Sequence, residues 1–279
     1  MPELPEVETV RRGLEDLLIG RSIVGIDVRD RRLRSLVEAA VLERWVQGRR
    51  VVQVSRRAKY LLLHLQASAT AEESRLIVHL GMSGQLVAVR AATPLEPHTH
   101  VVFRIDDGRE LRFRDPRRFG LVDALPASAV ASDRRFRDLG VEPLSDECTS
   151  ERFVALSRGV RKPVKNFLMD AQRVVGVGNI YACEALWVAG VHPLRAAGRI
   201  SARRWARITE SVQDVLRRAI ARGGTTLNDF HDAYGGAGWF QVELRVYGRE
   251  GEACSRCRGA IRRRVLAGRS TYFCSGCQR

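Results

Sequence analysis

Four of the six cysteines have the spacing of metal ligands. Cys254-x-x-Cys257 and Cys274-x-x-Cys277 are separated by sixteen residues, which fits the C-x2-C-x15–20-C-x2-C spacing of zinc sites. Each pair would direct two thiolates at one ion, so we expect one tetrahedral Zn²⁺ site with a structural role and no open position for water. A segment of about forty residues buries too little surface to fold without such a cross-link. The alternative, buried cysteines without a ligand, leaves the paired spacing unexplained.

The N-terminal stretch, MPELPEVE, could present a reactive amine. If Met1 is removed, Pro2 carries the α-amino group, which ordinarily titrates near 7.7–8.0, whereas a lysine titrates near 10.4. On the order of 300-fold more of such an amine is neutral at pH 7 than of a lysine. It could attack a sugar C1′ and form an iminium, with Glu3 beside it as an acid or base. Taken alone, capping of the following helix is the simpler interpretation of these residues.

Three further motifs carry groups that suit DNA. HLGMSG (79–84) and DPRRFG (115–120) place Met82, Arg117 and Phe119 at strand ends, where they could fill a duplex from which a base has been extruded. For Met82 and Phe119 alone, core packing is the plainer interpretation. RVVGVGNIY (173–181) puts glycines before a helix N-terminus, which can hold a phosphate, although for this motif alone an interhelical turn is the plainer interpretation.

The composition favours a polyanionic partner. The 279 residues include 47 Lys and Arg against 32 Asp and Glu, which gives a net charge of +15. Nucleic acid is the first candidate for such a chain, and a merely solvated basic surface is the alternative. No run of about eighteen apolar residues and no basic-plus-apolar leader is present, so we expect no membrane span and a cytoplasmic protein.

The hydrophobic pattern predicts a helical start followed by strands. Apolar residues at helical spacing predict a helix over 4–19, with Pro5 in its first turn. Residues 21–125 are rich in Val, Ile and Leu and predict a β-sandwich or barrel, with a helix near 35–46 and an exposed, mobile loop over 66–75. The strand candidates cover 22–28, 50–55, 59–65, 75–80, 85–89, 100–105, 109–114 and 120–125.

The second half changes character. Helical patterns are expected near 150–160, 165–171, 179–190 and 201–224, followed by a Gly-rich loop over 225–238. We therefore predict four segments. They are a β domain with its leading helix over 1–130, a linker over 131–149, a helical domain with the loop over 150–238, and a zinc-binding β segment over 239–279.

Taken together and in this order, PELPEVE, HLGMSG, DPRRFG, VVGVGNIYACEAL and the terminal GRSTYFC-x2-CQ resemble bacterial formamidopyrimidine-DNA glycosylase. This is the Fpg branch of the Fpg/endonuclease VIII family, and the resemblance runs from Pro2 to Gln278. It implies an α+β multidomain fold: an N-terminal helix plus β-sandwich, a helix–two-turn–helix domain and a C-terminal zinc-finger β-hairpin. It also implies one structural Zn²⁺ and a monomer associated with the nucleoid. The partner it implies is double-stranded DNA containing oxidised purines or abasic sites.

The resemblance also implies roles for individual residues. The mature N-terminal proline is the nucleophile of the family, which corresponds to Pro2. Glu3 would protonate the opening deoxyribose ring, Glu6 would support it, and Lys59 would contact a phosphate beside the lesion. The trio that fills the void left by the flipped base corresponds to Met82, Arg117 and Phe119. The other expected DNA-binding residues are Lys165, Asn179, Tyr181 and Arg269.

The reaction that the resemblance implies is N-glycosidic cleavage through a Pro2 imine, followed by β,δ-elimination and without a catalytic metal. The loop over 225–238 would close over flipped 8-oxoguanine, but Asn228 and His231 within it match no assigned role. An endonuclease VIII-like enzyme for oxidised pyrimidines is one alternative, although its opening is typically PEGPE. A non-catalytic DNA-binding protein is the other, and the intact Pro2-Glu3 pair with Lys59 argues against it.

Overall fold

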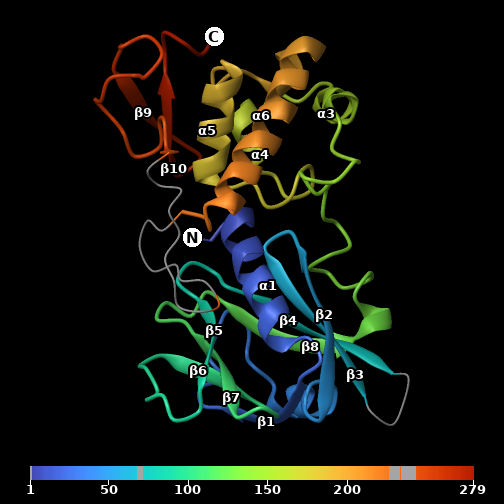
Figure 1. Ribbon diagram of the computed structural model, residues 1–279. Coiled ribbons are helices and arrows are strands. Elements are labelled where there is room, and N and C mark those ends of the chain that lie inside the picture. Colours follow the sequence, from blue (N-terminus) through green and yellow to red (C-terminus); the bar gives the residue numbers. More distant parts are fainter. Residues whose placement is uncertain (1, 68–71, 226–232, 234–242) are drawn as a thin grey trace. The chain divides into compact units, whose positions relative to one another are not determined.

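The structure is a computed structural model that describes residues 2–67, 72–225, 233 and 243–279. The chain divides into two compact units, one of residues 1–137 with 222–239 and the other of residues 138–221 with 240–279. The first unit contains helix α1 and the large sheet, and the second contains the helical bundle and a β-hairpin (Figure 1). The division into four functional segments stays a prediction.

Helix α1 (Leu4–Leu18) follows from its apolar spacing and its N-terminal signals. Glu3 is the N-cap, Pro5 lies in the first turn, and Glu6 closes a capping box with Glu3, which satisfies main-chain N–H groups that have no partner within the helix. The helix buries one apolar stripe and stops before Gly20, whose φ is +82°. The predicted helix is confirmed, and so is the capping interpretation of its acids.

Eight strands form one antiparallel sheet in the first unit, in the order β5-β7-β6-β1-β2-β3-β4-β8. The strands are β1 (Ser22–Val28), β2 (Arg49–Arg57), β3 (Tyr60–Ala67), β4 (Glu73–His79), β5 (Gln85–Arg90), β6 (Thr99–Ile105), β7 (Arg109–Arg114) and β8 (Leu121–Pro126). Strands β1 and β2 are joined through only two residue pairs. The sheet therefore consists of two four-stranded halves with a narrow hydrogen-bonded connection.

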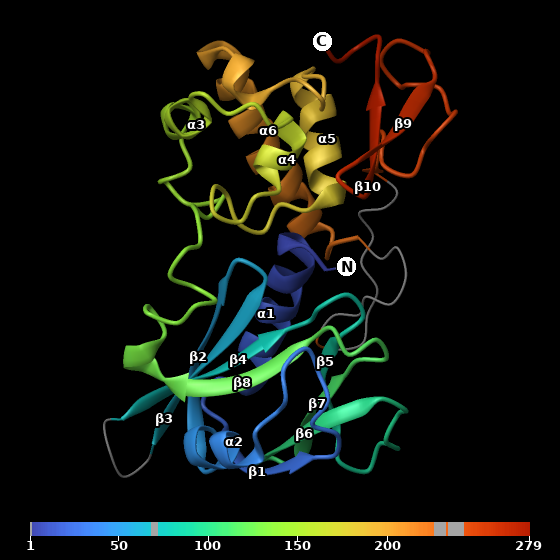
Figure 2. The same cartoon turned by 180° about the vertical axis from the view of Figure 1, so that it is seen from behind.

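The two halves share one hydrophobic core, which confirms the predicted sandwich. Fully buried side chains of α1, of β2–β4 and of β5–β7 belong to the same cluster, including Val10, Leu63 and Phe103. Helix α1 lies against the strands in Figure 1, and the view from behind shows the short helix α2 (Ala39–Trp45) near β1 (Figure 2). A core of this size fixes the strand ends, where the candidate site residues lie.

Local departures from the predicted elements have simple causes. The expected strand over 59–65 begins at Tyr60, because Ala58 has a φ of +54° and forms a two-residue turn with Lys59. The helix expected near 35–46 is shorter and covers α2 only. Strands β3 and β4 run into the expected loop over 66–75, and residues 68–71 lie outside the described part.

The second unit is a helical bundle with a hairpin. Its helices are α3 (Ser150–Ser157), α4 (Val164–Leu168), α5 (Asn179–Ala189) and α6 (Ala202–Ala221), and its strands are β9 (Ile261–Leu266) and β10 (Arg269–Cys274). Helix α6 buries a stripe that includes Trp205, whose ring packs on Phe153 and Phe167. Helix α5 is buried nearly all round, so it forms the centre of this unit.

The hairpin packs against α5, as both ribbon views show (Figures 1 and 2). Ala267 and Gly268, which connect β9 to β10, both have positive φ, the backbone that a tight two-residue hairpin turn requires. Among the described residues, no helix has the length and hydropathy needed to cross a membrane.

Candidate functional site

The N-terminal corner of the first unit is built around the buried carboxylate of Glu6. Its Oε2 accepts a hydrogen bond from the main-chain N–H of Glu3 at 2.7 Å, and its Oε1 accepts one from the N–H of Thr225 at 2.8 Å. Glu6 and Glu3 are each 2% exposed, and Pro2 is buried beside them. The chain therefore holds its own N-terminus in a defined position, which an attacking amine requires.

Gly224 makes this arrangement possible. Its φ is +80°, and a Cβ at this position would lie 3.0 Å from Cγ and Oε1 of Glu6. A larger residue would push Thr225 away from the carboxylate. The partnership of Glu6 with Thr225 was not predicted, because 219 residues separate them in sequence. The only local signal is the glycine pair at 223–224, at the end of the helix expected over 201–224.

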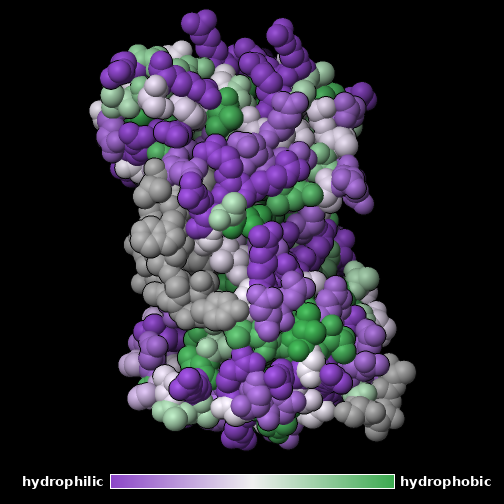
Figure 3. All heavy atoms as spheres, in the orientation of Figure 1, coloured by the Kyte–Doolittle hydropathy of each residue, from purple (hydrophilic) through white to green (hydrophobic). Residues whose placement is uncertain are grey.

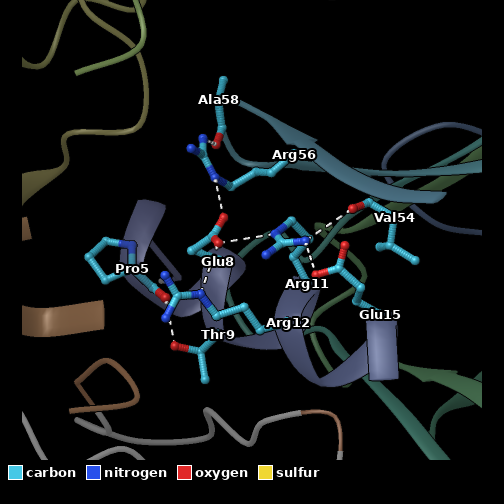
Figure 4. Close-up of polar contacts among 9 residues, drawn as sticks. All are labelled: Pro5, Glu8, Thr9, Arg11, Arg12, Glu15, Val54, Arg56 and Ala58. Carbon is cyan, nitrogen blue, oxygen red and sulfur yellow. Dashed lines mark hydrogen bonds and ion pairs between the residues drawn. The ribbon is translucent and has the colours of Figure 1, made fainter. Parts of the chain in front are cut away.

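An ion pair between Glu8 and Arg56 joins α1 to the end of β2, next to the β2–β3 turn that contains Lys59 (Figure 4). Glu8 of α1 contacts Arg56 Nε at 3.3 Å, and Arg56 Nη1 donates to the carbonyl of Ala58 at 2.8 Å. Glu8 also holds Arg11 and Arg12 of its own helix. The turn that carries Lys59 is thus tied directly to the first turns of the helix that follows Pro2.

Met82 and Phe119 are exposed apolar side chains on two neighbouring loops. Met82 follows the end of β4 and is 39% exposed, and Phe119 follows the end of β7 and is 46% exposed. The Arg117 guanidinium lies 5.1 Å from the centre of the Phe119 ring. The structure therefore contradicts the core-packing interpretation of Met82 and Phe119, because both are available to a ligand.

His79 connects these loops to the turn of Lys59. It pairs with Tyr60 across β3 and β4, the two rings pack at 4.8 Å, and its Nδ1 accepts the N–H of Gly81 at 2.9 Å. Burial, together with the charges of Arg34 and Lys59, lowers the pKa of His79 to about 4. The ring is therefore neutral at pH 7 and can accept this hydrogen bond.

The predicted site residues of the second unit lie where the bundle meets the hairpin. Lys165 is 1% exposed, and its Nζ donates to Thr271 Oγ1 at 2.7 Å and to the carbonyl of Ser270 at 3.3 Å. Asn179 Nδ2 donates to the same carbonyl at 2.9 Å. In this structure both side chains hold the hairpin against the bundle. Arg269, at the start of β10, is exposed.

Tyr181 is fully buried in α5, so its side chain faces the interior of the unit rather than solvent. One turn further along, Glu184 is also buried and accepts the main-chain N–H groups of Arg245, Val246 and Tyr247 at 2.8–2.9 Å. Burial raises the pKa of Glu184, while these three N–H groups lower it by less. We did not predict a role for Glu184, although a lone acid in the apolar run NIYACEALWVA is a signal.

The four paired cysteines form the predicted metal centre. Their sulfur atoms all lie within 4.8 Å of one another, with Cys254 and Cys277 at 3.8 Å and Cys257 and Cys274 at 3.4 Å. Tetrahedral zinc with bonds of about 2.3 Å to sulfur requires spacings of about 3.8 Å. The thiolates therefore fit one structural Zn²⁺, and four sulfur ligands leave no position for water.

The structure thus gathers the predicted residues at two places. Pro2, Glu3 and Glu6 share the N-terminal corner of the first unit, and the turn of Lys59 and the loops of Met82, Arg117 and Phe119 lie at the adjoining strand ends. Lys165, Asn179 and Arg269 lie around the start of β10 in the second unit. Asn228 and His231 lie outside the described residues. On the face shown in Figure 3, hydrophilic residues cover most of the helical unit, whereas apolar patches appear over the sheet.

Comparison with known proteins assigns the chain to a family. The N-terminal domain of formamidopyrimidine-DNA glycosylase matches residues 1–122, its H2TH domain matches 139–231, and a zinc finger found in FPG and IleRS matches 251–279. The chain belongs to the formamidopyrimidine-DNA glycosylase family. The resemblance drawn from the motifs is therefore confirmed.

Relatives in this family match the chain over its whole length. The formamidopyrimidine-DNA glycosylases of Alteromonas mediterranea and Syntrophotalea carbinolica are 47% and 49% identical, over 100% of both chains. A Lactococcus lactis FPG mutant in complex with Fapy-dG DNA has a TM-score of 0.90 at 32% identity, over 100% of both chains. The MutM (FPG) protein of Thermus thermophilus has a TM-score of 0.86 at 37% identity, covering 99% of this chain and 98% of that one.

Proposed function

We propose that this protein excises oxidised purines from double-stranded DNA through an imine formed by the Pro2 amine, and then cleaves the strand by β,δ-elimination. Membership of the family makes it a DNA glycosylase of base-excision repair with lyase activity at abasic sites. Relatives from Lactococcus lactis bind Fapy-dG DNA and abasic-site DNA. The observation that carries the mechanism is the N-terminal corner, where Glu6 fixes Glu3 and hence the neighbouring Pro2.

The chemical steps assign one task to each group at this corner. After removal of Met1, the Pro2 nitrogen attacks C1′, the bond to the damaged base breaks, and Glu3 delivers a proton to the opening sugar ring. The resulting iminium at C1′ acidifies C2′. Loss of the C2′ proton expels the 3′ phosphate, and a second elimination expels the 5′ phosphate. Hydrolysis of the imine then returns the free amine of Pro2.

Extrusion of the base requires the loops at the strand ends. A base in a stacked duplex is out of reach of an amine, so it must leave the helix, at a cost of about a few kcal/mol. Met82, Arg117 and Phe119 are the groups we propose to occupy the space it leaves, since two of them are exposed apolar side chains on neighbouring loops. Lys59, on the adjacent turn, would bind the phosphate beside the lesion.

The second unit supplies binding to the DNA backbone in this proposal. Arg269 is exposed at the hairpin turn and can reach a phosphate. Lys165 and Asn179 hold the carbonyl of Ser270, the residue that follows Arg269. We therefore propose that these two side chains act on DNA mainly by fixing the orientation of the hairpin, and that Tyr181 supports α5 from within.

The substrate assignment is tested with two matched duplexes, one with 8-oxoguanine opposite cytosine and one with thymine glycol. We expect faster release of 8-oxoguanine and strand products with phosphate at both new ends, as β,δ-elimination requires. A clear preference for thymine glycol would instead assign an endonuclease VIII-like specificity. Binding of both duplexes without release of either base would support a non-catalytic DNA-binding protein.

A further inference from the structure

Asp115, the first residue of DPRRFG, lies beneath the two loops that carry Met82, Arg117 and Phe119. Its side chain is completely buried, and its two carboxylate oxygens accept hydrogen bonds from both loops. Oδ1 accepts the hydroxyl of Ser83, the residue after Met82, at 2.6 Å. Oδ2 accepts the N–H of Gly120, the residue after Phe119, at 2.7 Å.

The contact between the loops extends beyond this carboxylate. The N–H of Arg117 lies 3.3 Å from Ser83 Oγ and 3.3 Å from Asp115 Oδ1. A Cβ at Gly81, the residue before Met82, would lie 2.4 Å from the carbonyl carbon of Phe119. Both residues that flank Met82 are therefore engaged with the second loop, by a hydrogen bond on one side and by backbone packing on the other.

The second loop is also fixed from behind. The main chain of Asp115 is anchored in the strand region, since its N–H donates to the carbonyl of His98 and its carbonyl accepts the Nε2–H of His100 at 2.8 Å. Arg118, between Arg117 and Phe119, has a φ of +60°, a strained backbone for a residue with a side chain. Its guanidinium is held by Asp30 at 2.7 Å.

We propose that Asp115 and Ser83 are positioning residues that lock the two loops into one rigid wedge, so that Met82, Arg117 and Phe119 enter the duplex as a unit. The inference rests on the proposed function, because it concerns the step in which the void is filled. A rigid wedge has little side-chain and loop entropy left to lose when it enters DNA. Loops that move separately would lose this entropy when the base is extruded, which would raise the free energy of that step.

This role predicts a dependence on substrate that a general loss of stability would not produce. An intact 8-oxoguanine is stacked and paired, so its extrusion depends on the wedge. An abasic site has no base to unstack, so its cleavage depends on the wedge much less. A residue that positions the wedge should therefore affect base excision more than cleavage at a preformed abasic site.

The experiment compares single-turnover rates on both substrates for Ser83→Ala, Asp115→Asn and the double variant. Ser74→Ala is the matched control, since Ser74 is a buried serine of the same unit that donates to the carbonyl of Trp45 at 2.5 Å. Ser83→Ala is the milder change and leaves the buried carboxylate in place. Thermal unfolding of each variant measures its loss of stability separately.

We expect Ser83→Ala to slow 8-oxoguanine excision about tenfold, the effect of losing one hydrogen bond to a charged group, and to slow abasic-site cleavage by less than about twofold. The double variant should be little worse than Asp115→Asn alone, because both changes break the same link. A 2-aminopurine next to 8-oxoguanine, with cytosine kept opposite the lesion, should report slower entry of the wedge.

Equal slowing on both substrates, or the same split in Ser74→Ala, would overturn this role for Asp115 and Ser83 while leaving the glycosylase assignment intact. A wild-type protein that releases no base would overturn the proposed function itself, and the wedge with it. The two failures are therefore distinguishable within one set of measurements.

Discussion

Glu6 in the first unit and Glu184 in the second are hydrogen-bonded in the same way, but they hold different parts of the chain in place. Each is a buried glutamate that accepts main-chain N–H groups from a distant part of the chain. Glu6 accepts hydrogen bonds from the main-chain N–H groups of Glu3 and Thr225. Glu184 accepts them from the three successive N–H groups of residues 245–247. The first arrangement fixes an amine terminus, and the second fixes the segment that leads into the zinc-binding hairpin.

Burial and hydrogen bonding do not by themselves identify a catalytic carboxylate. Both glutamates organise backbone that local sequence leaves undetermined. Only Glu6 does so next to a group that can act as a nucleophile. Changes confined to one unit should therefore separate chemistry from binding.

Insertion of one alanine between Met1 and Pro2 disrupts only the N-terminal corner of the first unit. After Met1 removal the Pro2 nitrogen is an amide, and the new amine is displaced from the position that Glu6 fixes. We expect base release to fall by at least about 100-fold, with DNA binding preserved. Single-turnover excision and a binding titration check this, and mass spectrometry must confirm the new terminus. Unchanged excision would show that Pro2 is not the nucleophile.

Removal of zinc disrupts only the hairpin of the second unit. The hairpin depends on its four thiolates, so chelation should unfold it and weaken DNA binding by at least about tenfold through lost phosphate contacts. Fluorescence anisotropy with labelled duplex, before and after metal removal verified by elemental analysis, measures the change, and added zinc should restore binding. Unaltered affinity after complete removal would contradict the role given to the hairpin.

Glu184→Gln changes the support of the second unit without removing the metal. An amide group in place of one carboxylate oxygen leaves a buried N–H without an acceptor, which should lower the free energy of unfolding by about 3 kcal/mol. Urea unfolding measures this, with Glu210→Gln, an exposed glutamate on α6, as the control. Equal stability of the two variants would mean that the link from α5 to residues 245–247 contributes little.

The pH dependence of stability should have opposite signs in the two regions. The pKa of His79 is lowered to about 4 in the folded protein, so its contribution is complete above the unfolded pKa near 6.5 and is lost as the pH falls. The loss should be about 2 kcal/mol between pH 7 and pH 5. Comparison of wild type with His79→Gln by urea unfolding checks this, and an equal loss in both proteins would contradict it.

The pKa of Glu184 is raised by burial. Its contribution to the free energy of unfolding is therefore complete at a pH below the ordinary pKa of a glutamate. It is lost as the pH rises through the raised value. The difference in unfolding free energy between wild type and Glu184→Gln should therefore shrink as the pH rises from acidic values toward 7. A difference that grows over this range would show that the three N–H donors, not burial, determine the titration.

The sequence predicted the features that depend on local patterns. Helix α1, the strands and the cysteine quartet follow from periodicity, capping and ligand spacing, which a short window of residues contains. The motifs also indicated Met82 and Phe119, although their exposure needed the structure. Single motifs left the family open. The motifs taken together and in this order indicated it.

The remaining features depend on tertiary contacts that no local pattern encodes. Thr225 donates to Glu6, which lies 219 positions earlier in the chain, and Asp115 accepts from Ser83, which lies 32 positions earlier. Lys165 Nζ donates to Thr271 Oγ1 in this structure, a contact that its sequence neighbours do not indicate, and its contact with DNA stays a prediction. A lysine that contacts the protein interior and one that contacts a phosphate have the same sequence signal.

The most direct test of the proposed Pro2 mechanism is borohydride trapping on a duplex with 8-oxoguanine opposite cytosine, followed by peptide mapping of the covalent adduct. We predict a reduced adduct on the N-terminal peptide, attached at the nitrogen of Pro2 in protein that lacks Met1. An adduct on Lys59 or on another lysine, or no adduct from Met1-free protein that binds the duplex, would contradict it.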